Sequence, residues 1–124
     1  MIFLRNLALA AATSLLMAAP AMADEAVKHY KGKSAESLEQ AMANFSEYNT
    51  KLEKILANDL TPVTMNDVHE LTYTLENALE KMGSELGELA ATLERVHIAS
   101  ENLDDKTIHS EGKKYLKTSR TLVK

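Results

Sequence analysis

Four histidines and six methionines are the side chains of this sequence that could bind a metal ion or a haem iron. In a helical bundle a methionine and a histidine can bind a haem iron as its two axial ligands, and Met42 and His109 would take these roles here. Estimated helix pairing places Met42 beside Met82 but His109 beside position 98, about 24 Å further along at helical rise. Because one iron cannot bridge that gap, we expect no haem and assign the methionines to the core.

Three histidines form a better candidate for a metal site. The same estimate places His29, His97 and His109 near one end of the molecule, with Glu94 and Glu101 about one helical turn on either side of His97. Imidazole together with carboxylate suits zinc, copper or nickel. None of the usual short ligand spacings is present. A small periplasmic metal or haem carrier is therefore the alternative function, and we expect no resident cofactor.

Enzyme motifs are absent from the sequence. The chain has no Gly-x-Ser-x-Gly turn, glycine-rich phosphate loop or His-Glu-x-x-His zinc motif. Carboxylates between positions 76 and 88 recur at the spacing of an exposed helix face, whereas acid–base catalysis needs carboxylates in a shielded cleft. We therefore expect no catalytic residues and no enzyme activity.

One apolar seam without proline runs through the second half of the chain. Its steps of three, four or seven residues predict a single long helix over about 65–103, packed against partner helices in the manner of a coiled coil. The seam consists of Val68, Leu71, Leu75, Ala78, Leu79, Met82, Leu86, Leu89, Leu93, Val96 and Leu103.

Shorter helices are predicted before and after the long one. Apolar residues at helical spacing predict a helix over 35–58 with Ser34 as its N-cap, and another over 105–122. Thr64 and Asp67 resemble a weak capping box for the long helix. Residues 24–33 lack periodicity and form an extended lead-in. The predicted fold is an all-α antiparallel three-helix bundle over residues 34–124, with one long central helix.

Treating each helix connection as a mirror point gives packing expectations. The first helix should cover about two thirds of the long helix, with Tyr48 opposite Leu75, and the third helix should cover the rest. Tyr30, Leu93 and Tyr115 should then form an aromatic plug where the third helix folds back.

Two glycines, Gly83 and Gly87, lie inside the long helix. They indicate either a place where another helix approaches closely or a local weakness of about 1 kcal/mol each relative to alanine. We favour the close approach.

The N-terminal 23 residues have the pattern of a secretory signal peptide. Met1 and Arg5 precede an apolar stretch, and small residues lead up to a cleavage site near Ala23. The stretch is short for a stable membrane span, and no cysteine is present to carry a lipid. The absence of cysteine also excludes disulfides, thiolate zinc sites and covalent haem attachment. We expect a secreted, free periplasmic protein of one domain that begins at residue 24.

The chain is acidic, with a formal net charge of −4, and removal of Arg5 with the signal makes it more so. This charge disfavours nucleic acid as a partner. The stretch 105–124 is the exception, since it holds six basic residues against two acidic ones, and should dock on the acidic remainder. Part of the long seam should stay exposed. Self-association or a periplasmic protein partner would cover it, and the alternative is a monomer whose exposed seam is lined by alanine and threonine.

Several stretches taken together resemble a known family. They are Asp24-Glu25, His29 to Lys33, Ala35 to Glu39, Asn44 to Asn49 and His69 to Leu79. The chain resembles short exported proteobacterial proteins catalogued only as a domain of unknown function, and the likeness covers nearly all of the expected mature chain. This resemblance implies no activity, cofactor or catalytic residue. The favoured function is a non-enzymatic periplasmic helical protein that binds a partner or itself.

Overall fold

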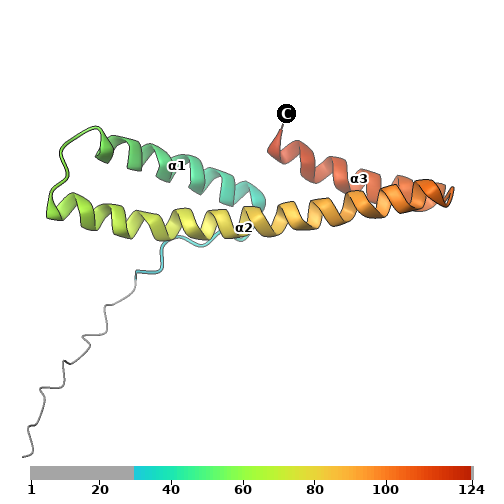
Figure 1. Ribbon diagram of the computed structural model, residues 1–124, viewed down its shortest axis with the longest axis horizontal. Coiled ribbons are helices and arrows are strands. Elements are labelled where there is room, and N and C mark those ends of the chain that lie inside the picture. Colours follow the sequence, from blue (N-terminus) through green and yellow to red (C-terminus); the bar gives the residue numbers. More distant parts are fainter. Residues whose placement is uncertain (1–29, 124) are drawn as a thin grey trace, which may run out of the picture.

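Three helices make up the computed structural model, which describes residues 30–123 (Figure 1). They are α1 (Leu38–Leu56), α2 (Pro62–Glu101) and α3 (Asp105–Leu122). Over the described residues the all-α class and the long central helix are confirmed. The signal peptide, positions 24–29 of the lead-in and His29 lie outside these residues. No helix in the described part is long and apolar enough to cross a membrane.

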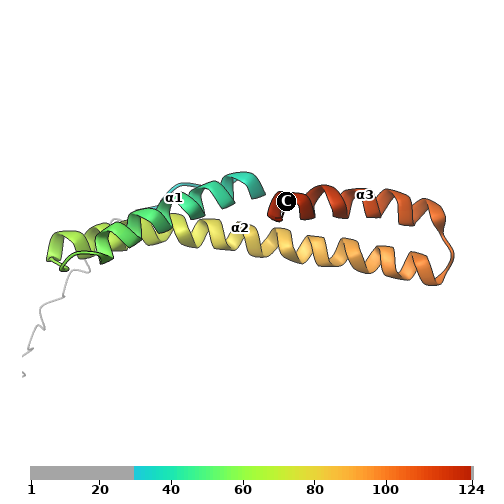
Figure 2. The ribbon, with the colours of Figure 1, turned by 90° about the horizontal axis from the view of Figure 1, so that it is seen from above.

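Helix α2 is the long central helix, and both other helices pack against it. Its 40 residues extend about 60 Å at 1.5 Å per residue. Helix α1 runs antiparallel along the first half of α2, and α3 runs antiparallel along the second half (Figures 1 and 2). The two arms lie end to end over the middle of α2, so each level of the rod holds two helices. The expected order, with the first helix covering one part of the long helix and the third helix covering the rest, is confirmed, although α1 covers about half of α2 rather than two thirds.

The helix limits follow from their N-caps. Ser37 accepts a hydrogen bond from the Gln40 amide at 3.2 Å, which starts α1 three residues later than the predicted Ser34 cap allowed. Thr61 and Thr64 form the capping box of α2, with Pro62 in the first turn. Asp104 caps α3, whose bounds agree with the predicted 105–122.

The half of the rod that contains α1 has an apolar core. Tyr48 of α1 packs with Leu71 and Leu75 of α2, as the expected pairing requires, and all three are more than nine-tenths buried. Ala41 and Ala78 are fully buried. Because small residues stand at these two positions, α1 and α2 can approach closely.

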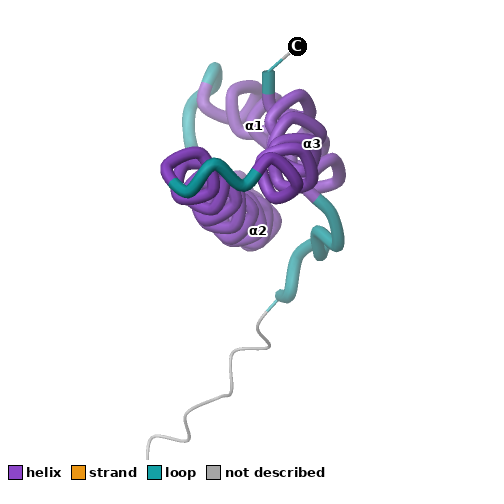
Figure 3. The backbone as a smooth tube through the Cα atoms, turned by 90° about the vertical axis from the view of Figure 1, so that its right-hand side faces the viewer, coloured by secondary structure: helices purple, strands orange, loops and turns teal. Residues whose placement is uncertain are grey.

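An extended segment over residues 30–37, here called the strap, lies against α2 on a different side from α1 (Figure 3). Gly32 has φ +68, and a Cβ there would lie 2.7 Å from the Thr74 backbone nitrogen. The Lys33 amide donates to Thr74 Oγ1 at 3.0 Å, and the Asn77 side-chain amide donates to the Lys31 and Lys33 carbonyls. The strap is thus fixed by backbone contacts to one turn of α2.

The predicted aromatic plug is wrong because of the strap. The first residue of the strap, Tyr30, packs edge-on against Tyr73, with ring centroids 6.3 Å apart. Tyr73 precedes Leu93 by 20 residues on α2, which is about 30 Å. Tyr30 therefore lies at the opposite half of the rod from Leu93 and Tyr115.

The half of the rod that contains α3 buries only small or polar residues fully, and its larger apolar residues Leu89, Val96, Ile108, Tyr115 and Leu122 are partly buried. Its buried residues among those described are Thr92, Ala99 and Glu111. Glu111 accepts a hydrogen bond from Arg95 Nε at 2.8 Å and another from Lys114. The basic α3 does dock on the acidic chain, but this ion pair between helices has the reverse polarity, with its cation on α2 and its anion on α3.

Candidate interaction surface on the central helix

Three leucines of α2 form an exposed row. Leu79, Leu86 and Leu93 stand seven residues apart, and 51, 49 and 46 % of their surfaces remain accessible. Met82, Leu89 and Val96 follow each of them by three residues and are partly buried. Alternation of three and four residues is the seam of a coiled coil, which is apolar because a second helix normally covers it.

The row lies beside the face that the other helices cover. Helices α1 and α3 pack on the side of α2 that carries Ala78, Thr92 and Ala99. Each residue turns a helix by about 100°, so Leu79 is displaced to one flank of Ala78. Asn77, which holds the strap, is displaced to the other flank. The strap thus covers one flank of α2 and leaves the leucine row open.

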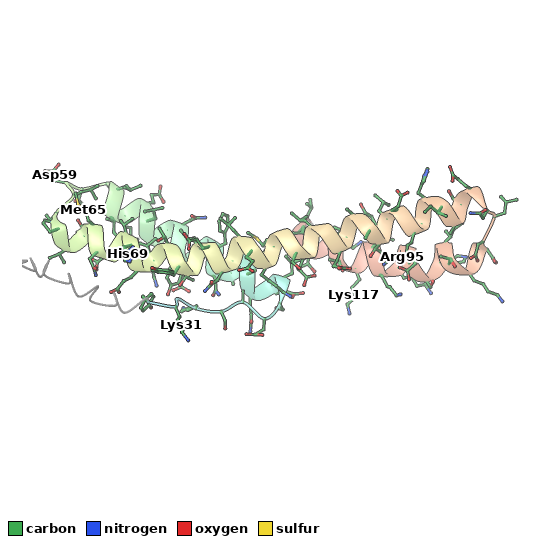
Figure 4. All side chains as sticks on the ribbon, turned by 60° about the horizontal axis from the view of Figure 1, so that its bottom comes forward. Lys31, Asp59, Met65, His69, Arg95 and Lys117 are labelled. Carbon is green, nitrogen blue, oxygen red and sulfur yellow. The ribbon has the colours of Figure 1, made fainter. Side chains whose placement is uncertain are left out.

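Helix α3 extends this apolar flank. Arg95 points from α2 toward α3 and meets Glu111 on the strap-side flank (Figure 4). Leu116 follows Glu111 by five residues, about 140° round the helix, which brings it to the flank of Leu93. Leu116 is 46 % exposed. We call Leu79, Leu86, Leu93 and Leu116 the leucine face.

Charges border the leucine face with opposite signs on its two sides. The outer rim of α2 carries glutamates, and the outer rim of α3 carries basic residues, all of them exposed. At about 100° per residue, these side chains flank the leucines rather than the strap. The rim residues are Glu76, Glu94 and Glu101 on α2, and Lys113 and Arg120 on α3. Asp105, at the start of α3, is an acidic residue on the same side.

The two arms meet over the middle of α2, beside this surface. The pKa of Glu39, in the first turn of α1, is lowered by hydrogen bonds from backbone N–H groups and Ser37, and further by Thr121 and Lys117 of α3. The N-terminus of α1 and the C-terminus of α3 are therefore in contact. The leucine face runs past this junction without a break in α2.

A depression lies in the α1 half of the rod, between the strap, α1 and α2. Tyr30, Tyr48, Lys51 and Leu71 are among its lining residues. The Lys51 ammonium lies 4.1 Å from the centre of the Tyr48 ring and 2.7 Å from a Glu47 oxygen, and this pairing lowers the pKa of Glu47 and raises that of Lys51. Lys54, Asp67 and Glu70 also line the depression, so charged groups of both signs border it.

Two of the predicted metal ligands lie within the described residues, His97 on α2 and His109 on α3. His97 Nε2 is 3.4 Å from a Glu101 oxygen on the same exposed face of α2, and His109 is exposed on α3. His29 lies outside the described residues. Within residues 30–123 no three His, Cys, Asp or Glu side chains cluster as a metal site would require. The site formed with His29 stays a prediction.

The preferred interpretation of the two glycines of α2 is wrong within the chain. A Cβ added at Gly83 or Gly87 would meet nothing within 4 Å. No helix of the described chain approaches them, and they are exposed weak points of α2. The glycine with a steric role is Gly32, whose neighbours in the sequence gave no periodic signal.

The described residues define a small all-helical protein whose central helix carries an exposed row of leucines. The chain belongs to the family of unknown function DUF6746, whose model matches residues 1–124. This match confirms the resemblance drawn from the sequence. No curated protein and no solved structure matches the chain.

Proposed function

We propose that this protein is exported to the periplasm, has no enzyme activity, and works by binding another helical chain along the leucine face. One observation carries the binding proposal: a heptad row of leucines, about half exposed, on a helix whose own partners pack elsewhere. Isolated exposed leucines are ordinary, whereas a contiguous apolar row with charged rims is typical of a protein interface.

The export proposal is supported by the signal-peptide pattern of residues 1–23. Its test is the mass and location of the protein made from the full sequence in a Gram-negative host. We expect osmotic shock to release a form that lacks residues 1–23. Elemental analysis of that form also tests the carrier alternative, because a carrier would contain zinc, copper or iron near one equivalent per chain, whereas a binding protein would contain none.

The binding proposal is tested with a photo-activated cross-linking residue in place of Leu86 in living cells. The matched control is Ser84, which is exposed on the same helix two residues away and therefore about 200° round it. We expect a defined covalent adduct from position 86 and none from position 84. Equal yields at both positions, or no adduct from position 86, would overturn the proposal.

A further inference from the structure

We infer that the leucine face is covered by a second copy of this chain, which lies alongside the first so that α2 of each copy packs against α3 of the other. This inference rests on the proposed function and names its partner. The two-fold axis of the dimer then runs along the rod, and the contact is the same on both copies.

The first argument is the incomplete core beside α3. In the described part of this half, nothing apolar larger than Ala99 is buried, while Leu86, Leu93 and Leu116 are each about half exposed. The larger apolar residues of this half, such as Leu89, Val96 and Ile108, are only partly buried, so apolar burial offsets less of the conformational entropy of ordering α3 than full burial would. A second copy would bury the same leucines and complete this half of the rod.

The second argument is the number of helices at each level. The chain supplies two antiparallel helices everywhere along α2, and two copies supply four. Four antiparallel helices around one core form a standard bundle, in which each helix contacts two neighbours. Here α2 would contact its own α3 on one side and the α3 of the second copy through the leucine face.

Charge selects the orientation. Arg95 pairs with Glu111 across the helices, so Glu94 is level with about position 112 of α3. A two-fold axis along the rod keeps levels unchanged, and Glu94 then faces Lys113 of the second copy. An axis across the rod near Leu86 would instead bring the glutamate rims of the two α2 helices together, with Glu94 near Glu76. The first arrangement joins opposite charges, and the second joins like charges.

The first experiment measures the mass of the purified protein by light scattering at micromolar concentration. We expect a dimer, which Leu93→Glu converts to a monomer by raising the dissociation constant at least about a hundredfold, since two carboxylates would be buried without partners. The matched control is Ile98→Glu, because Ile98 is equally exposed, at 48 %, but lies about 140° away round α2. The control should remain dimeric. A wild-type monomer at these concentrations overturns the inference.

The second experiment tests the orientation and does not depend on altering the apolar surface. In a homodimer, residue 94 of each copy faces residue 113 of the other. Glu94→Lys therefore gives two contacts between lysines, and Lys113→Glu gives two contacts between glutamates. Each variant should dimerise about tenfold more weakly than wild type. Mixed in equal amounts, the two variants should form a heterodimer of near wild-type affinity, because both contacts regain opposite charges. Failure of the mixture to recover overturns the arrangement.

The outcomes separate this inference from the proposed function. If the purified protein is monomeric but position 86 cross-links a different protein in cells, the second copy is wrong and the binding function stands. If position 86 gives no adduct in cells and light scattering finds no dimer, both fail.

Discussion

Alongside α1, the central helix buries Leu71, Leu75 and Ala78, whereas alongside α3 it buries Thr92 and Ala99. The first half is closed further by the strap, which adds backbone hydrogen bonds to Thr74 and Asn77. The second half is held by the Glu111 carboxylate between two cations, one of them Arg95 of α2. Two arms of similar length are thus attached to one helix by different means.

This difference shows which half can stand alone. Burial of leucine and tyrosine side chains contributes about 1.5–3 kcal/mol each, whereas a partly solvated ion pair contributes about 1 kcal/mol or less. The half with α1 therefore has the composition of a self-sufficient core. The half with α3 has three large apolar side chains, Leu86, Leu93 and Leu116, on the exposed flank, where a further chain can cover them. Each prediction below probes one side of this contrast, at concentrations low enough for monomer.

The largest effect is expected in the core of the α1 half. Leu75→Ala removes a nearly buried side chain from the cluster with Tyr48 and Leu71, and we expect the free energy of unfolding to fall by about 2–4 kcal/mol. Leu79→Ala, one turn further on, removes a half-exposed leucine and should cost less than about 1 kcal/mol. Urea unfolding followed by circular dichroism measures both. Equal losses would mean that the buried cluster of the α1 half contributes no more to stability than a half-exposed leucine of the leucine face.

The next effect concerns the strap. Gly32→Ala forces a side chain into a left-handed backbone conformation and against the Thr74 and Tyr73 backbone, so we expect a loss of about 2 kcal/mol in the free energy of unfolding. Hydrogen exchange should quicken at the Lys33 amide, which bonds Thr74, and stay unchanged in α3. A variant as stable as wild type would show that the strap adds nothing to the α1 half.

Much of this fold could be predicted because helices have a period. The predicted 65–103 and 105–122 agree with α2 and α3 to within a few residues. The predicted start of α2, at about residue 65, is later than the observed start at Pro62. Proline ends many helices, but it is also favoured in the first helical turn. The regular rise of a helix also predicts which residues of α1 and α2 lie side by side near the first turn, and Tyr48 does pack with Leu75.

Helical periodicity could not predict the path of the strap, nor which helices cover the apolar seam of α2. The strap is placed by the Asn77 amide and by Gly32, and hydrogen bonds to backbone carbonyls leave no period in the sequence. The seam showed that α2 has an apolar stripe wider than one partner covers. It could not show which part of that stripe α1 and α3 would leave uncovered, because the period of the seam does not say to which side of α2 each arm packs, and Leu86 is left about half exposed.

Acid should weaken the α3 half through Glu111. Lys114 and Arg95 hold the pKa of its carboxyl below the ordinary value, so the folded chain binds this proton less readily than the unfolded chain. The resulting stabilisation is present above the ordinary pKa and is lost as pH falls through the lowered one. The lowered pKa of Asp104, the N-cap of α3, acts in the same direction.

Glu111→Gln isolates this contribution from other carboxylates. We expect the variant to be less stable than wild type at pH 7, and the difference between the two in urea unfolding to shrink as the pH is lowered toward 3. Hydrogen exchange in α3 should report the change before exchange in α1 does. A difference that does not depend on pH would show that the carboxylate charge has no part in docking α3.

The smallest effect is expected at Gly83, which lies near the boundary between the two halves. A Cβ there meets nothing within 4 Å in the single chain, so Gly83→Ala should raise the free energy of unfolding by about 0.5–1 kcal/mol through helix propensity alone. Urea unfolding at low concentration measures this gain. If Gly83→Ala were destabilising there, a helix would have to approach Gly83 within one chain, and α1 and α3 would then overlap rather than meet end to end. That result would remove the two-helix cross-section from which the contrast between the halves is built.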